Sequence, residues 1–86
     1  MNINELIAIV KKKLEAEIII QDLKIEDKSF LHKNHKGHQE GKFHLKLTIK
    51  SEELNKLSKI VSTKRVYSVL DLEIKEHIHS IQILLN

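Results

Sequence analysis

Four of the six histidines lie in residues 29–44, which also hold both glycines and which we call the histidine segment. Three of them, His32, His35 and His38, are spaced by three residues. Neutral imidazole is the commonest side-chain ligand of zinc, copper and non-haem iron, so this spacing predicts metal binding. A closed site made of loop histidines alone would be atypical, because the sequence offers neither a thiolate nor a helical His-x-x-x-His pair. Half a site, completed by a partner, fits the pattern better.

Motifs for conventional catalysis are weak in this sequence. It has no Gly-x-Ser-x-Gly elbow, no Walker loop and no Rossmann glycine pattern. Asp27, Ser29 and His32 have the residue types of a hydrolytic triad, but three residues at one strand end cannot adopt the required geometry. We therefore expect Asp27 and Ser29 to stabilise the base of the histidine segment, and we do not expect an enzyme.

The length of 86 residues suits one small domain, residues 1–86. No apolar run approaches the roughly 18 residues of a membrane span, and the N-terminus lacks the pattern of a secretory signal. The absence of cysteine excludes disulfides and any iron–sulfur site built from this chain's thiolates alone. We expect a cytoplasmic protein without membrane contact that is monomeric when alone.

The charge is mildly basic, with a formal net charge of +3 and a pI near 9.2. This balance permits contact with nucleic acid or with an acidic partner and demands neither. Nearly all basic residues are lysines, and Arg65 is the single arginine. Arginine is the usual bidentate reader of guanine and phosphate, and the few aromatic residues give no platform for stacking bases. Sequence-specific recognition of DNA is therefore weakly indicated.

Periodicity predicts a helix followed by two strands in the first half of the chain. The helix is expected over residues 2–16, with Asn2 as its N-cap and Glu5 completing a capping-box-like pair. Strands are expected over residues 22–30 and 43–50, and because one short segment joins them, we expect an antiparallel pair. The apolar stripe of the helix consists of Ile3, Leu6, Ile7, Val10 and Leu14.

Two helices and a third strand are expected in the second half. Ser51 is a good N-cap for a short helix whose first turn holds two glutamates. A longer helix is expected over residues 63–76, with Ser62 as its candidate cap, and the last strand over residues 78–85. The short helix has an apolar side formed by Leu54, Leu57, Ile60 and Val61, and the longer one by Val66, Tyr67, Val69, Leu70 and Ile74.

The element order αββααβ brings a fifth histidine toward the histidine segment. About 27 residues with two helices join the last two strands, and such a connection gives a parallel pair with a right-handed crossover. The start of the last strand then lies beside the start of the middle one, so His79 should approach the segment that ends at His44. Strand alternation places His79 on the same face as Ile81, Ile83 and Leu85.

Taken together, the motifs of residues 22–86 resemble the BolA-like family. The resemblance implies an α+β fold of αββαβ order with an extra short helix, related to the type II KH domain. Its three-stranded mixed sheet would carry the helices on one face. The residues that carry the resemblance are Asp27-Lys28-Ser29, His32, His35, the strand opened by His44, the segment Val66-Tyr67-Ser68-Val69-Leu70 and the closing Ile78-His79-Ser80-Ile81.

The resemblance also implies a partner, a monothiol glutaredoxin. In such complexes a [2Fe–2S] cluster is bridged by the glutaredoxin cysteine, a glutathione thiolate and histidines of the BolA-like chain. Carried over to this sequence, His79 is the strand ligand and His35 or His32 is the loop ligand. Spacing from Ser29 favours His35, and the extra His38 leaves that choice open. The implied role is iron–sulfur cluster trafficking or iron and redox regulation, with no cluster in the isolated chain.

Some members of the family are described as transcriptional regulators, so the alternative function is DNA binding through the second and third helices. Lys59, Lys64 and Arg65 would then contact phosphates. The sequence departs from the family here, because Ser62, Thr63 and Lys64 stand where many members have Arg-His-Arg. The Gly-x-x-Gly loop of a KH-type RNA clamp is also missing. We therefore prefer the cluster-partner interpretation.

Overall fold

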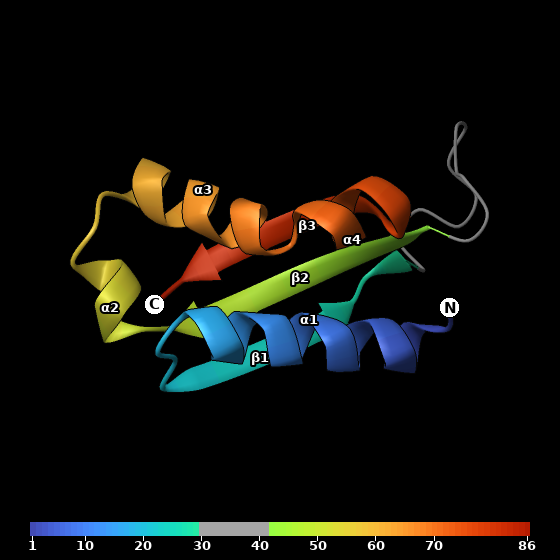
Figure 1. Cartoon of the computed structure of the whole chain (residues 1–86), viewed down its shortest axis with the longest axis horizontal. Coiled ribbons are helices and arrows are strands. Elements are labelled where there is room, and N and C mark those ends of the chain that lie inside the picture. Colours follow the sequence, from blue (N-terminus) through green and yellow to red (C-terminus); the bar gives the residue numbers. More distant parts are fainter. Residues whose placement is uncertain (30–41) are drawn as a thin grey trace.

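The computed structural model describes residues 1–29 and 42–86 (Figure 1). The described chain is an α+β fold whose elements follow the predicted order, except that the last predicted helix is divided into two. None of its described helices has the length and apolar character needed to cross a membrane. In chain order the elements are α1 Ile3–Glu17, β1 Asp22–Asp27, β2 Phe43–Lys50, α2 Glu52–Asn55, α3 Lys59–Val69, α4 Asp71–Glu76 and β3 Ile78–Leu85.

The first helix, α1, begins at Ile3 because Asn2 caps it. Asn2 Oδ1 accepts the backbone N–H of Glu5 at 2.8 Å, and Asn2 Nδ2 donates to Glu5 Oε1 at 2.9 Å. The two contacts form the predicted capping pair. The helix ends before the β-branched Ile18, whose backbone is extended and whose side chain is buried. The fully buried residues of its predicted stripe are Leu6, Val10 and Leu14.

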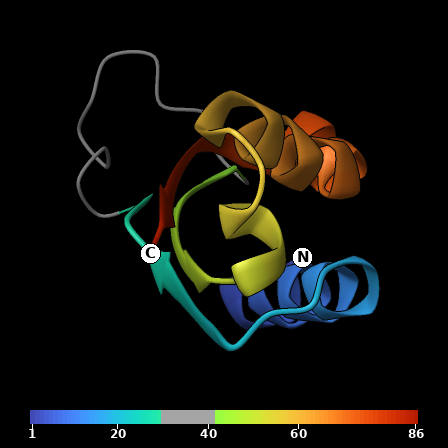
Figure 2. The same ribbon diagram turned by 90° about the vertical axis from the view of Figure 1, so that its left-hand side faces the viewer.

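The three strands form one mixed sheet in the order β1–β2–β3. β1 and β2 are antiparallel, while β2 and β3 are parallel, as the connections between them predicted. The helices of the described chain lie on one face of this sheet (Figure 2). The core fills the space between them, and from the sheet it takes the side chains of Leu45, Leu47, Ile49 and Ile78.

The opposite face, which we call the open face, is covered by no helix of the described chain (Figure 2). Its residues alternate with those of the core, since successive side chains of a strand point to opposite sides. In the register of the strands, Lys46 lies opposite Glu26 on one side and Gln82 on the other. The open face consists of Asp22, Lys24 and Glu26 on β1, His44, Lys46, Thr48 and Lys50 on β2, and Ser80, Gln82 and Leu84 on β3, with Lys28 beside Glu26 just after β1.

The helical region after β2 differs from the prediction in where the second long helix begins. Ser51 caps α2 as predicted, its Oγ accepting the N–H of Leu54 at 3.1 Å. However, α3 begins at Lys59 with Ser58 as its cap, so the prediction of a Ser62 cap is wrong. Ser62 is fully buried, and its hydroxyl donates to the Leu54 carbonyl at 2.6 Å. This bond ties α3 to α2.

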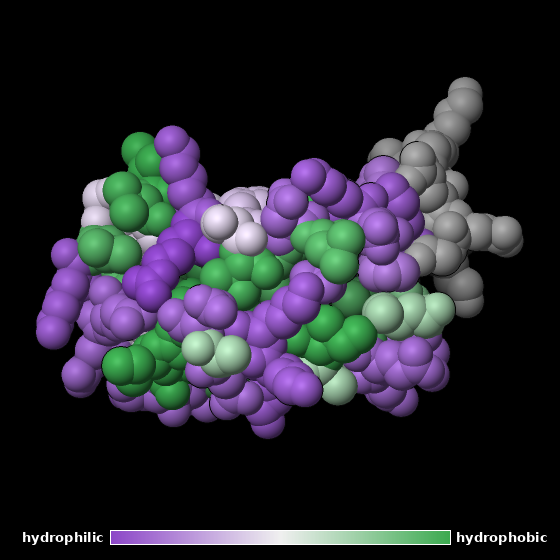
Figure 3. All heavy atoms as spheres, in the orientation of Figure 1, coloured by the Kyte–Doolittle hydropathy of each residue, from purple (hydrophilic) through white to green (hydrophobic). Residues whose placement is uncertain are grey.

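The earlier start of α3 changes which apolar side chains are buried. Of the apolar side predicted for the short helix, only Leu54 is buried. Leu57, Ile60 and Val61 are 38, 70 and 50% exposed, and Figure 3 shows apolar surface over the start of α3. Tyr67 is 40% exposed, so its predicted place in a buried stripe is also wrong. With Ser58 as its cap, α3 has its first residues, Ile60 and Val61, exposed and buries Ser62 and Val66.

The region predicted as one helix over residues 63–76 is divided at Leu70. Its ψ of 16° separates α3 from α4, although the N–H of Ile74 still donates to the Leu70 carbonyl at 2.9 Å. α4 is docked onto α1 by an ion pair in which Lys13 Nζ lies 2.6 Å from Glu73 Oε2. Only 5% of the Glu73 side chain is exposed. α4 leads directly into β3, so this contact helps to position the strand that carries His79.

Candidate functional site

Hydrogen bonds between β1 and β2 close the base of the histidine segment. Asp27 Oδ1 accepts the N–H of Ser29 at 2.9 Å, which turns the chain after β1. β1 ends at Asp27 and not at the predicted residue 30, which lies outside the described residues. Lys28 N–H donates to the His44 carbonyl at 2.7 Å, and His44 N–H donates to Ser29 Oγ at 3.0 Å. The prediction that Asp27 and Ser29 stabilise this base is confirmed.

The starts of β2 and β3 lie side by side, as the predicted parallel pairing required. Phe43 is opposite Ile78, and the Phe43 N–H donates to the His77 carbonyl at 2.9 Å. The next pair is His44 with Ser80, so His79 is one extra residue on β3 and forms a β-bulge. The structure therefore places His79 at the point where the histidine segment enters β2.

The bulge changes the face on which His79 lies. Alternation predicted that His79 shares a face with Ile81 and the two apolar residues that follow it, and this is wrong. The extra residue breaks the alternation, so Ile78 and Ile81 both face the core while His79 is exposed. The His79 ring instead lies beside the ring of His44, with ring centroids 5.0 Å apart and planes tilted by 56°. The bulge thus directs the His79 imidazole away from the core.

His44 belongs to this site, although the sequence did not predict it as a ligand or as a neighbour of the His79 ring. The side chain is on the open face but only 4% exposed. Its Nδ1 lies 2.7 Å from Ser80 Oγ, which fixes the ring beside His79. Alternation did place His44 on the polar face of β2. The sequence carries no signal for the bulge, and without the bulge alternation places His79 on the core face with Ile81.

The described part of the site brings two imidazoles together, those of His44 and His79. Among residues 1–29 and 42–86, no group of three or more His, Cys, Asp or Glu side chains is arranged to hold a metal ion. His32, His35 and His38 lie outside the described residues, so their convergence on His79 stays a prediction. Imidazole nitrogens are common metal ligands, and of the two rings that of His79 is exposed. This arrangement fits half of a metal site whose remaining ligands come from a partner.

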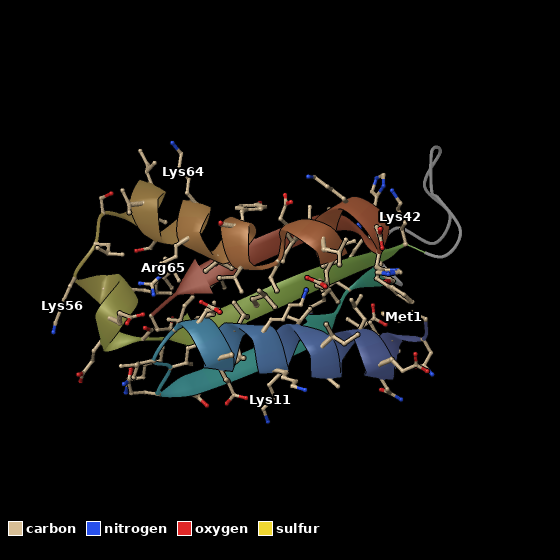
Figure 4. The ribbon with its side chains drawn as sticks, in the orientation of Figure 1. Met1, Lys11, Lys42, Lys56, Lys64 and Arg65 are labelled. Carbon is tan, nitrogen blue, oxygen red and sulfur yellow. The ribbon has the colours of Figure 1, made fainter. Side chains whose placement is uncertain are left out.

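Of the three residues predicted to contact nucleic acid, two are exposed to solvent and one is bonded to other parts of the protein. Lys59 and Lys64 are exposed on α3, and Figure 4 shows Lys64 pointing away from the molecule. Arg65 instead points inward, where its Nη2 donates to the Glu17 carbonyl at 2.9 Å and lies 3.1 Å from Glu53 Oε2. Arg65 therefore joins α3 to the end of α1 and to α2, which gives it a structural role. DNA contact by the two lysines stays a prediction.

Positive charge on the open face gathers around Glu26. Lys28 Nζ lies 3.1 Å and Lys24 Nζ 3.9 Å from its carboxylate oxygens. The hydrogen bond from Lys28 lowers the pKa of Glu26 below its ordinary value, burial opposes this, and the charges of Lys24, Lys28 and Lys46 lower it further. A groove of about 350 Å³ begins beside these lysines and is lined by Lys28, His44, Lys46, Ser80 and Gln82 among others.

Comparisons with known proteins agree with this architecture. The BolA domain of SufE1 from Arabidopsis thaliana is 26% identical and superposes with a TM-score of 0.76, covering 92% of this chain and 87% of that chain. BolA1 from Arabidopsis thaliana, at 22% identity, gives a TM-score of 0.79 with 93% and 88% covered. BolA1 from Mus musculus, at 18% identity, gives 0.70 with 92% and 62% covered. The last two likenesses speak for the fold alone.

At the level of sequence, a comparison with curated proteins finds no match. The family described as BolA-like protein, however, matches residues 14–86, which is most of the chain and includes every strand. The match also spans the bulge and both imidazoles of the site. The chain therefore belongs to the BolA-like family.

Proposed function

We propose that this protein shares a [2Fe–2S] cluster with a monothiol glutaredoxin, in iron–sulfur cluster trafficking or in iron and redox regulation. His79 is its strand ligand, and His35 or His32 is its loop ligand. The observation that carries the proposal is the β-bulge, which exposes the His79 ring beside the His44 ring. This places an available imidazole where β2 leaves the histidine segment, and the segment holds the remaining candidate ligands.

The chemistry of the chain supports a shared site over a closed one. The sequence contains no cysteine, so the soft thiolate ligands of an iron–sulfur cluster come from the partner and from glutathione. Imidazole ligation raises the potential of such a cluster above that of an all-thiolate one. The chain itself presents His79, holds His44 through Ser80, and closes the base of the histidine segment. These tasks are those of a binding partner, and we propose no enzymatic step.

Mixing the protein with a cluster-loaded monothiol glutaredoxin and glutathione tests this proposal. We expect the visible absorption and circular dichroism of the [2Fe–2S] chromophore to change when the imidazole replaces an existing ligand. The substitution His79→Ala should abolish the change. His77→Ala is the matched control, because the His77 ring lies near Glu76, 3.7 Å from its carboxylate, and should leave the change intact. An unaltered spectrum with the wild-type protein would contradict the proposal.

DNA binding is not advanced as a second function. It relied on three basic residues of α3, and the only arginine among them is engaged by Glu17 and Glu53. Two exposed lysines on one helix are an ordinary solvated surface and give no base-specific contacts.

A further inference from the structure

The open face of the sheet adjoins the His79 site. His44 lies on this face, touches the His79 ring and pairs with Ser80. From there the groove of about 350 Å³ continues between Lys28, Lys46 and Gln82. A molecule bound at His79 would therefore lie next to the lysines that line this groove, Lys28 and Lys46. The helices of the described chain leave the face uncovered (Figure 2).

The charge of the open face is unbalanced. Four lysines, Lys24, Lys28, Lys46 and Lys50, stand against two carboxylates, those of Asp22 and Glu26, which leaves an excess of positive charge. The Lys24 side chain is 70% exposed, so it is available to a second anionic group. Glu26 holds Lys28 and Lys24 in place and partly neutralises them. Charge complementarity therefore favours an acidic occupant for this surface.

We propose that the open face is the docking surface for an acidic patch on the protein that supplies the thiolate ligands. The inference rests on the proposed function, and it adds the face of contact and the charge of the partner's surface. The acidic patch would lie over Lys24, Lys28 and Lys46, next to the groove that leads to His44. Leu84, 39% exposed near the far end of β3, supplies an apolar contact on the same face.

A protein partner fits this face better than a nucleic acid. Strong readers of phosphate and bases are arginine and aromatic side chains. The open-face residues include no arginine, phenylalanine, tyrosine or tryptophan, and the one aromatic ring among them, that of His44, is buried. Arg65, the single arginine of the sequence, is tied to α1 and α2. Scattered lysines around one glutamate suit the carboxylates of a protein surface, which pair with ammonium groups as point charges.

Charge variants of the open face test the proposal against matched variants of α1. Lys24→Gln with Lys46→Gln removes two charges without placing a carboxylate opposite Glu26, and Lys11→Gln with Lys12→Gln removes two exposed charges from the helical layer. Affinity for cluster-free monothiol glutaredoxin is measured by calorimetry at low salt. We expect the first pair to weaken binding on the order of fivefold or more and the second to change it less than about twofold. Glu26→Gln should strengthen binding.

A second arm separates this proposal from the proposed function. Hexaglutamate is titrated into the ¹⁵N-labelled protein, and its binding is mapped by NMR without any glutaredoxin. We expect shifts on the open face that fade with added salt and with Lys24→Gln and Lys46→Gln. If these shifts occur but wild-type protein binds no glutaredoxin, the proposed function fails while the acidic-ligand surface is supported.

Other outcomes overturn the docking surface. If the wild-type protein alters the cluster spectrum but both lysine pairs bind glutaredoxin equally well, the proposed function stands and the docking face is wrong. Equal hexaglutamate shifts on α1 and on the sheet would also overturn it. A twelve-nucleotide thymidine strand that displaces hexaglutamate from the open face at a concentration below that of hexaglutamate would also overturn the proposal. The preferred occupant would then be a nucleic acid.

Discussion

Replacing Lys13 should cost more stability than replacing its partner Glu73. The two side chains are unequally buried, with 38% of Lys13 and 5% of Glu73 exposed, and their charged atoms lie 2.6 Å apart. Glu73 Oε1 is buried and has no hydrogen-bond partner among the described residues. Lys13 is therefore the group that compensates a buried carboxylate. Removing one member of a buried pair costs about 3–5 kcal/mol, because the other charge stays buried.

The exposure of Lys13 reduces that figure, since water already screens its end of the pair. We expect Lys13→Met to lower the free energy of unfolding by about 2 kcal/mol, equivalent to a Tm lower by roughly 8–16 °C in a domain of this size. Glu73→Met removes the buried charge altogether, so its effect should stay within about 1 kcal/mol of zero. The double variant should match Glu73→Met alone, which gives a coupling energy of about 2 kcal/mol.

Urea unfolding of the four proteins, followed by far-ultraviolet circular dichroism at neutral pH, measures these differences. The midpoints should be ordered with Lys13→Met lowest and the other three close together. Two results would refute the reasoning: a Lys13→Met midpoint equal to that of the wild type, or strictly additive effects in the double variant. Either would mean that the ion pair contributes nothing and that packing alone docks α4 onto α1.

Two smaller predictions concern other contacts. Ser62→Ala leaves the buried Leu54 carbonyl without its 2.6 Å donor and should lower the unfolding free energy by about 1–2 kcal/mol in urea, whereas Ser68→Ala at an exposed position should have almost no effect. NMR titration should find the pKa of Glu26 below its ordinary value, and Lys28→Met should raise it. Because the folded pKa is the lower one, the stabilisation from Glu26 is present above the ordinary glutamate pKa and is lost as the pH falls through the lowered value. A Glu26 pKa that does not respond to Lys28→Met would contradict the assignment of its cause.

Local patterns were sufficient to predict the frame of the molecule. The alternation in residues 43–50 and 78–85 marked β2 and β3, and the two-helix connection between them predicted their parallel pairing. Asn2 and Ser51 were recognisable as caps because each precedes an apolar-periodic run and its side chain can accept a free helix N–H. These features depend on neighbours in sequence, which is why sequence patterns indicate them.

Features that depend on tertiary packing were not predictable in the same way. Ser58 and Ser62 are both suitable caps in the sequence. In the structure Ser58 caps α3, because the Ser62 side chain is buried and bonds to the Leu54 carbonyl of α2. The exposure of Ile60 runs against its hydrophobicity and follows from that choice. The sequence brought His79 to the correct end of the sheet but not to the correct face, because no glycine or other local signal marks the bulge.

Nitrogen coupling to the shared cluster tests the central claim most directly. The protein is labelled with ¹⁵N-histidine, combined with unlabelled cluster-loaded glutaredoxin and glutathione, and the cluster is reduced by one electron for pulsed electron paramagnetic resonance. The proposal predicts a strong ¹⁵N hyperfine coupling that persists in His77→Ala and disappears, or loses one of its components, in His79→Ala. A reduced cluster that shows no ¹⁵N coupling in the wild-type mixture would contradict ligation by this chain.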